Sequence, residues 1–187
     1  MSNTLRFSIE DDIGVAPDVE CFESAIAANQ FDAELVSIGV GVSEEGWVDF
    51  LFDSTPSAND GATMAAIVAG HALASAKHHK YKSIDKATDA LVSAGFSFAG
   101  KQFSLSANAR QRIIAVDLMR NDPAIAYPVN WNTIDDADSL PIADSEMMHG
   151  MALTAMGTVR AYIDMGSAAK AQVRLATTVE EVESVTL

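Results

Sequence analysis

The sequence predicts an α+β protein with two parts: an N-terminal domain that contains a β-hairpin and one Ala-rich helix, and a C-terminal, mainly helical domain with small β-hairpins. Two stretches carry this prediction. Residues 31–53 place apolar side chains at strand spacing in two segments around a turn at 43–46, which is typical of an antiparallel hairpin. Residues 95–105 place phenylalanines on either side of Ala99 and Gly100, which predicts a second, shorter hairpin. Because so small a hairpin is not stable alone, we expect the flanking helices to cover its phenylalanines.

The N-terminal part predicts a strand at 5–9, a helix at 18–28 and an Ala-rich helix over 62–77, capped by Asn59 or Asp60. The apolar pattern of the Ala-rich helix is diffuse, which is typical of a helix buried on more than one side.

Within the hairpin at 31–53, both faces carry apolar residues, so we expect both to be covered. Gly39 and Gly41 indicate a bulge or a close backbone approach.

A basic, histidine-containing stretch at 77–82 predicts the boundary between domains 1–78 and 79–187. Beyond it, cap residues and apolar spacing predict helices and short strands. In order, these are a helix at 84–94 capped by Ser83, the hairpin, a helix at 107–119 capped by Ser106, strands at 127–133 and 139–142 around a turn at 135–138, a helix at 145–165 stopped by Gly166, a helical piece at 168–176, and a last helix capped by Thr177 with Glu180.

Charge and composition exclude several classes of function. The net charge is −14, from 12 basic and 26 acidic residues, which argues against binding to nucleic acid through many phosphate contacts. Seven of the basic residues fall within 77–112, as a belt between two acidic blocks. Cys21 is the only cysteine, which fits a reducing compartment. No apolar run reaches the roughly 18 residues of a membrane span, and the N-terminus lacks the apolar region of a signal peptide, so we expect no membrane partner.

The sequence contains few residues with catalytic potential. The carboxylates at 10–12 lack the ligand spacing of a calcium loop, and the adjacent side chains of His78 and His79 diverge, so one ion would need ligands from elsewhere. His71 and His149 are interpreted as packed histidines. No nucleophile motif and no phosphate-binding loop is present. We therefore expect no catalytic residue, no cofactor and no metal site.

Ala- and Met-rich helix sides are the remaining unusual feature. Methionine adapts to irregular contact surfaces, and alanine allows close helix approach, so these sides predict an interface between copies of the chain or with a partner. Ordinary core packing is the alternative interpretation. The predicted interface residues are Met64, Ile67, Val68, His71, Met148, Met151, Ala155, Val159 and Tyr162.

Part of the chain resembles a known family. The segment 95–106, the segment 109–113, the Pro-x-x-Trp-x-Thr-x-Asp stretch at 128–135 and the helical segments at 169–173 and 177–181 keep the order and spacing of an uncharacterised domain found in tailed-phage and prophage proteins. The resemblance covers about residues 80–185. It implies a virion-associated protein, with no catalytic residues to carry over.

The resemblance and the composition together predict a non-enzymatic structural component of a tailed-phage virion, in the tail, as a fibre, spike, baseplate or adaptor subunit. It would be assembled in the host cytoplasm, would contact other virion proteins, and would form a homo-oligomer. Residues 1–76 would attach it to a neighbouring component. One alternative is an assembly chaperone for a tail fibre, which would be absent from finished particles. The other, which we disfavour, is a small metal-dependent enzyme built on the carboxylates at 10–12 and the histidines.

Overall fold

The computed structural model describes residues 3–9, 13, 16–41 and 47–187, and it shows an α+β protein, as predicted. By compactness the chain divides into an N-terminal unit, residues 1–81 with 173–185, and a C-terminal unit, residues 82–172 with 186–187. The division differs from the predicted domains in placing 173–185 with the N-terminal unit. Within the described residues, none of the helices is long and apolar enough to cross a membrane.

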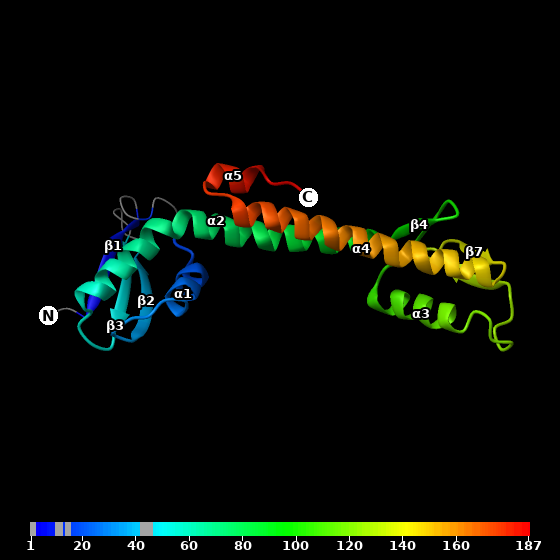
Figure 1. Ribbon diagram of the computed structural model, residues 1–187, viewed down its shortest axis with the longest axis horizontal. Coiled ribbons are helices and arrows are strands. Elements are labelled where there is room, and N and C mark those ends of the chain that lie inside the picture. Colours follow the sequence, from blue (N-terminus) through cyan, green and yellow to red (C-terminus); the bar gives the residue numbers. More distant parts are fainter. Residues whose placement is uncertain (1–2, 10–12, 14–15, 42–46) are drawn as a thin grey trace. The chain divides into compact units, whose positions relative to one another are not determined.

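The N-terminal unit contains a three-stranded antiparallel sheet. The strands β1 (Thr4–Ser8), β2 (Leu35–Gly41) and β3 (Trp47–Phe52) have the order β1-β3-β2. The predicted hairpin at 31–53 is therefore confirmed as β2 and β3, while its turn at 43–46 lies outside the described residues. Helix α1 (Val19–Ala27) lies beside the sheet (Figure 1), and its N-terminus contacts α2 at His71.

One face of this sheet packs on the core and the other does not. Val48, Phe50 and Phe52 point inward and are at most 1% exposed. On the opposite face the Trp47 ring lies so close to Gly41 that a Cβ atom there would come within 2.1 Å of it, so Gly41 marks a close approach, as predicted. The expectation that both faces are covered is wrong, because Leu51, on the Trp47 face, is 38% exposed.

Helix α2 (Ala58–Ala94) is continuous through the predicted domain boundary. The two predicted helices at 62–77 and 84–94 are one, because residues 77–83 contain neither proline nor glycine to stop it. Its N-terminus is a reciprocal capping box: Ser57 Oγ accepts the Asp60 N–H, and Asp60 accepts the Ser57 N–H. The cap is therefore Ser57 instead of Asn59 or Asp60.

The first half of the Ala-rich part of α2 buries one side only, whereas residues 71–77 are all buried or half-buried. Ala65, Ala66 and Ala69 are exposed, whereas Met64 and Val68 are buried. The prediction of burial on more than one side is therefore wrong for residues 62–70, where the exposed alanines contribute their high intrinsic helix propensity, and it holds for residues 71–77.

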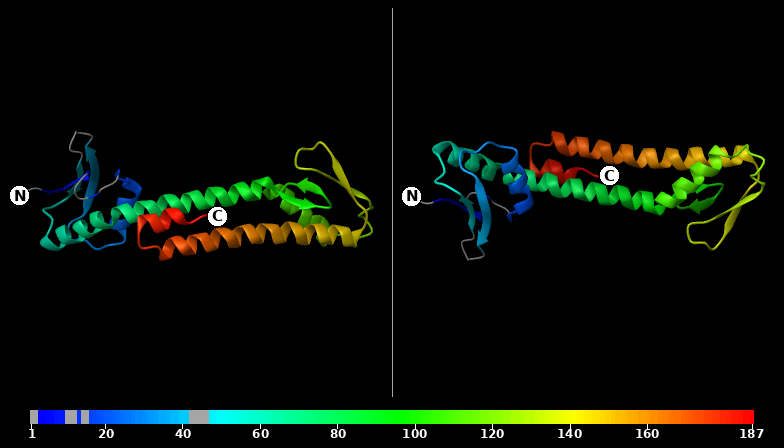
Figure 2. Two further views of the ribbon diagram at one scale, coloured as in Figure 1. Left: turned by 90° about the horizontal axis from the view of Figure 1, so that it is seen from above. Right: turned by 90° about the horizontal axis from the view of Figure 1, so that it is seen from below.

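The C-terminal unit places two short hairpins beside helices. β4 (Phe96–Phe98) and β5 (Lys101–Phe103) form the predicted phenylalanine hairpin, whose turn residues Ala99 and Gly100 both have positive φ. The other elements are α3 (Ala107–Leu118), β6 (Val129–Asn132), β7 (Ser139–Ile142) and α4 (Ser145–Leu175), the last shared with the N-terminal unit. In both views of Figure 2, α4 and the later part of α2 run side by side.

Helix α4 continues through Gly166, where a stop was predicted. Gly166 is buried, and a Cβ atom there would lie 2.6 Å from the Thr88 hydroxyl of α2. The glycine therefore allows two helices to approach closely and does not end α4. Helix α5 (Val179–Ser184) follows, with Thr178 as the N-cap in place of Thr177: its hydroxyl accepts the Glu181 N–H, and Glu181 accepts the Thr177 N–H.

Candidate functional site

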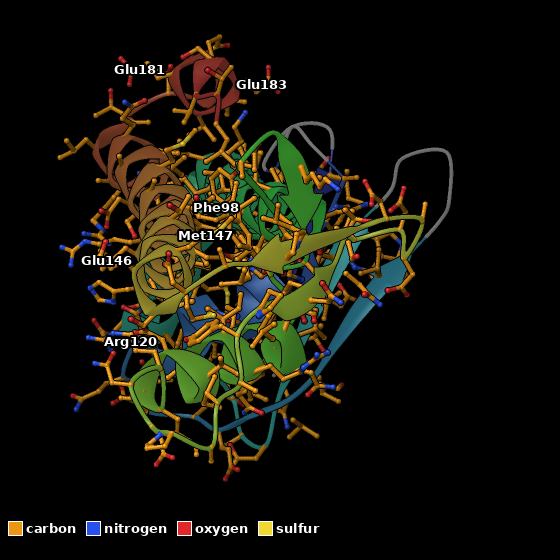
Figure 3. The ribbon with its side chains drawn as sticks, turned by 90° about the vertical axis from the view of Figure 1, so that its right-hand side faces the viewer. Phe98, Arg120, Glu146, Met147, Glu181 and Glu183 are labelled. Atoms are coloured by element: carbon orange, nitrogen blue, oxygen red, sulfur yellow. The ribbon has the colours of Figure 1, made fainter. Side chains whose placement is uncertain are left out.

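The residues predicted as an assembly interface lie in or against the cores of the two units. Met64, Val68 and His71 of the N-terminal unit are at most 2% exposed, and Ile67 packs against that core. In the C-terminal unit, Phe98 lies against α4, with its ring 3.8 Å from the position that a Cβ atom of Gly150 would take, and Figure 3 shows Glu146 on the outer side of the helix. Further along α4, four predicted residues are at most 8% exposed and Tyr162 packs against them; the four are Met148, Met151, Ala155 and Val159.

A fully buried side chain offers no surface to a second copy. The expectation that neighbouring copies must cover these helix sides is therefore corrected: the sheet and α1 cover the side of α2, and the two hairpins and α3 cover that of α4.

His71 is held by contacts on both ring edges and one ring face. Its ring stacks on Phe22 with 3.8 Å between centroids, and its Nε2 atom accepts the Asp18 N–H at 3.0 Å. Burial lowers the pKa of His71; the charge of Asp18 and a hydrogen bond with the Ala16 backbone raise it less, so the pKa lies below the usual 6.5. Neutral His71 thus holds the N-terminus of α1 against α2.

We expect the stability of the N-terminal unit to decrease as the pH falls, because folding disfavours the protonated form of His71. Below pH 6.5 the unfolded chain binds a proton at this residue while the folded chain does not, so the free energy of unfolding decreases as the pH falls, by at most about 1.4 kcal/mol per pH unit. The loss levels off below the folded pKa. Urea unfolding between pH 7 and pH 5, followed by circular dichroism, measures it. In the variant His71→Gln, the free energy of unfolding should depend less steeply on pH. An unchanged dependence on pH would contradict the prediction.

The two histidines considered as metal ligands each pair with a carboxylate. His78 Nε2 lies 3.1 Å from Glu20, and His79 Nε2 lies 3.3 Å from Asp18. In the described part of the chain, no group of three or more histidine, cysteine and acidic side chains could hold a metal ion. The carboxylates at 10–12 lie outside the described residues.

The candidate site is a polar groove in the C-terminal unit, with a volume of about 340 Å³. It lies between the segment that leads into α3 and the strand β6 with its following turn. The lining residues are mostly small and polar: Ser104, Ser106, Asn108, Ala109, Arg112, Asn130, Trp131, Asn132, Thr133, Ile134 and Asp136.

Strand alternation gives β6 its orientation in the groove. Trp131 points into the core and is 7% exposed, while its neighbours Asn130 and Asn132 are exposed. The Arg112 guanidinium lies 5.2 Å from the centre of the Trp131 ring. Among the described residues, Arg112 has no acidic partner within salt-bridge distance. The groove therefore holds a cation available to a ligand.

Hydrogen bonds fix the turn that closes the groove. The Thr133 hydroxyl donates to Asp135 at 2.6 Å and accepts the Asp138 N–H at 3.1 Å, and the Asn132 amide donates to Asp136 at 3.3 Å. The Thr133 hydroxyl and the Ala137 N–H lower the pKa of Asp135, so this carboxylate stays charged.

The lining offers hydroxyl, amide and ionisable groups that can hydrogen-bond a bound molecule. The serine hydroxyls accept backbone N–H groups, Ser104 from Ser106 and Ser106 from Ala109. Asp136 and Arg112 are the ionisable side chains among the lining residues.

The sequence predicts the strands and the turn but not the groove. The available signal was the Asn-Trp-Asn alternation opposite Pro141 in the partner strand, since proline fits only at a position whose N–H is not needed in the ladder. No family model, curated protein or solved structure matches the chain.

Proposed function

We propose that this chain is a non-enzymatic structural component of a tailed-phage virion, in the tail, that acts by protein–protein assembly. The resemblance of residues 80–185 to a phage domain supports the proposal. The observation that carries it is a set of apolar side chains exposed at the end of α3, namely Ile114, Leu118 and Met119, which are 43%, 78% and 48% exposed.

These exposed residues belong to a helix that already buries its other side. Ile113 of α3 is fully buried in the core, while Ile114 and Leu118, four residues apart, share one outward face. The core of the unit does not explain an outward apolar pair, and a cluster of such side chains is typical of a contact surface for another protein. The contact that best suits this face is with another copy of the chain, as a homo-oligomer.

The double variant Ile114→Lys with Leu118→Lys tests the contact. It should reduce the oligomeric mass measured by analytical ultracentrifugation, because two ammonium groups would have to be desolvated. It should leave the free energy of unfolding within about 0.5 kcal/mol, since both positions are exposed. The exposed Ala161 of α4 gives the control, Ala161→Lys, which should keep the mass of the unmodified protein. An unmodified protein that sediments as a monomer would contradict the homo-oligomer.

Mass spectrometry of purified particles tests the virion assignment itself. The protein should be found in the particles at a fixed ratio to other tail proteins. If it is present in infected cells but absent from particles, the assembly chaperone is the better assignment. If it is absent from both, the phage assignment is wrong.

A further inference from the structure

We propose that the groove beside β6 receives an extended segment of another polypeptide, which adds to the free edge of β6 as a third strand. The inference rests on the proposed function only in taking the partner to be a protein. The geometry of the groove supports it independently of any phage particle.

The pairing of β6 with β7 shows which backbone groups are free. The Thr133 N–H donates to the Asp138 carbonyl at 2.9 Å, and this pair continues the register in which Asn132 faces Ser139. In an antiparallel ladder, hydrogen-bonded and non-hydrogen-bonded pairs alternate. Because Thr133 is in a hydrogen-bonded pair, the backbone groups of Trp131 and Val129 also bond to β7. Those of Asn130 and Asn132 do not.

The residue opposite Asn130 agrees with this count. It is Pro141, which has no N–H to donate and is therefore tolerated only where the ladder needs none. The N–H and C=O groups of Asn130 and Asn132 consequently point away from β7, and both residues line the groove. Among the described residues, no hydrogen bond from outside the ladder reaches these four groups, whereas the next outward group on this edge, the Ile134 N–H, donates to the Gln102 carbonyl of β5 at 2.9 Å. The free stretch of the edge therefore ends at Asn132.

An unpaired strand edge is a template for another strand. The two asparagines are two positions apart, about 6.6 Å along β6, so a segment of about three residues would pair with all four groups. An extended polypeptide presents one N–H and one C=O along one edge at every second residue. This spacing matches the N–H and C=O groups of Asn130 and Asn132.

The walls of the groove also favour a peptide over a carbohydrate. Sugar rings commonly stack on an open aromatic face, but Trp131 is 7% exposed and Arg112 lies over its ring. Arg112 instead supplies a cation for an acidic side chain of the incoming segment. The occupant we propose is therefore an extended segment that contains aspartate or glutamate.

The experiment uses the full chain labelled with ¹⁵N and the blocked peptide acetyl-Thr-Asp-Thr-Asp-Thr-amide. Titration to millimolar peptide should shift the amide signals of Asn130 and Asn132 in a saturable way. The variant Asn130→Pro removes one outward N–H without touching the ladder, and it should weaken binding about tenfold. The matched variant Asn130→Ala removes the same side chain but keeps the N–H, and it should bind as the unmodified protein does.

A second pair of probes keeps the test valid if Asn130→Pro does not fold. Two further peptides carry N-methyl groups at alternate positions. In the first peptide the methylated amides would face β6, and it should lose affinity. In the second peptide they would face away from β6, and it should bind as the unmethylated peptide does. Equal binding by both, or no shift at either asparagine at millimolar peptide, would overturn the proposal. Saturable shifts with glucose or N-acetylglucosamine and none with peptide would assign the groove to carbohydrate. None of these outcomes depends on whether the protein is found in particles.

Discussion

Met151→Glu is expected to unfold the C-terminal unit and to lower its free energy of unfolding by more than about 4 kcal/mol. Met151 is fully buried, in the same core as Phe103, Ile113 and Trp131. A glutamate there would lose its hydration inside a cluster of mainly apolar side chains. Such a charge is neutralised or expelled, and either outcome disrupts the packing of α4 on both hairpins. Urea unfolding followed by circular dichroism measures the loss.

Leu153→Glu provides the matched control for Met151→Glu. Leu153 lies two residues further along α4, on the opposite side of the helix, and is 61% exposed. The same change of charge there should alter the free energy of unfolding by less than about 0.5 kcal/mol. If Met151→Glu remained folded and only lowered the oligomeric mass, the residue would lie in an interface between copies, as the sequence alone predicted.

The sequence predicted short-range structure well and helix continuity poorly. Cap and turn residues located α3, the phenylalanine hairpin and the strands β6 and β7, because these signals act within a few residues. The local sequence at Gly166 predicts a helix stop, because nothing nearby in the chain shows that Thr88, far away in the sequence, packs against this glycine. A glycine that ends a helix and a glycine that allows a neighbour to approach have the same local sequence.

The candidate site was predictable only in part, for a similar reason. Apolar spacing on α2 and α4 shows that a helix side is covered, but it does not show whether the same chain or another copy covers it. Residues such as Met151 are therefore predicted to be covered by another copy, whereas the same chain buries them. Conversely, Leu118 is apolar like the buried Ile113 of the same helix, and only its 78% exposure distinguishes it from a core residue. The free edge of β6 depends on pairing register, which the alternation of Asn130, Trp131 and Asn132 specifies only once the partner strand is known.

Gly95→Ala is expected to destabilise the C-terminal unit by about 3 kcal/mol. Gly95 joins α2 to β4 with φ of +85°, a conformation that costs any other L-residue energy. In addition, a Cβ atom there would lie 2.1 Å from the carbonyl oxygen of Phe103, a backbone atom held by the ladder between β4 and β5. Relief requires the hairpin to move away from α2, which would uncover Phe96 and Phe103. Thermal and urea unfolding measure the loss.

Gly100→Ala separates the two causes within the same hairpin. Gly100 also has positive φ, +76°, but no atom lies within 4 Å of the position that its Cβ would take. This variant should therefore show the conformational cost alone, about 1 kcal/mol. The difference between the two variants measures how rigidly the Phe103 backbone is fixed against the end of α2. Equal effects would mean that the hairpin shifts at little cost, and the phenylalanines would then not be the fixed centre around which this unit packs.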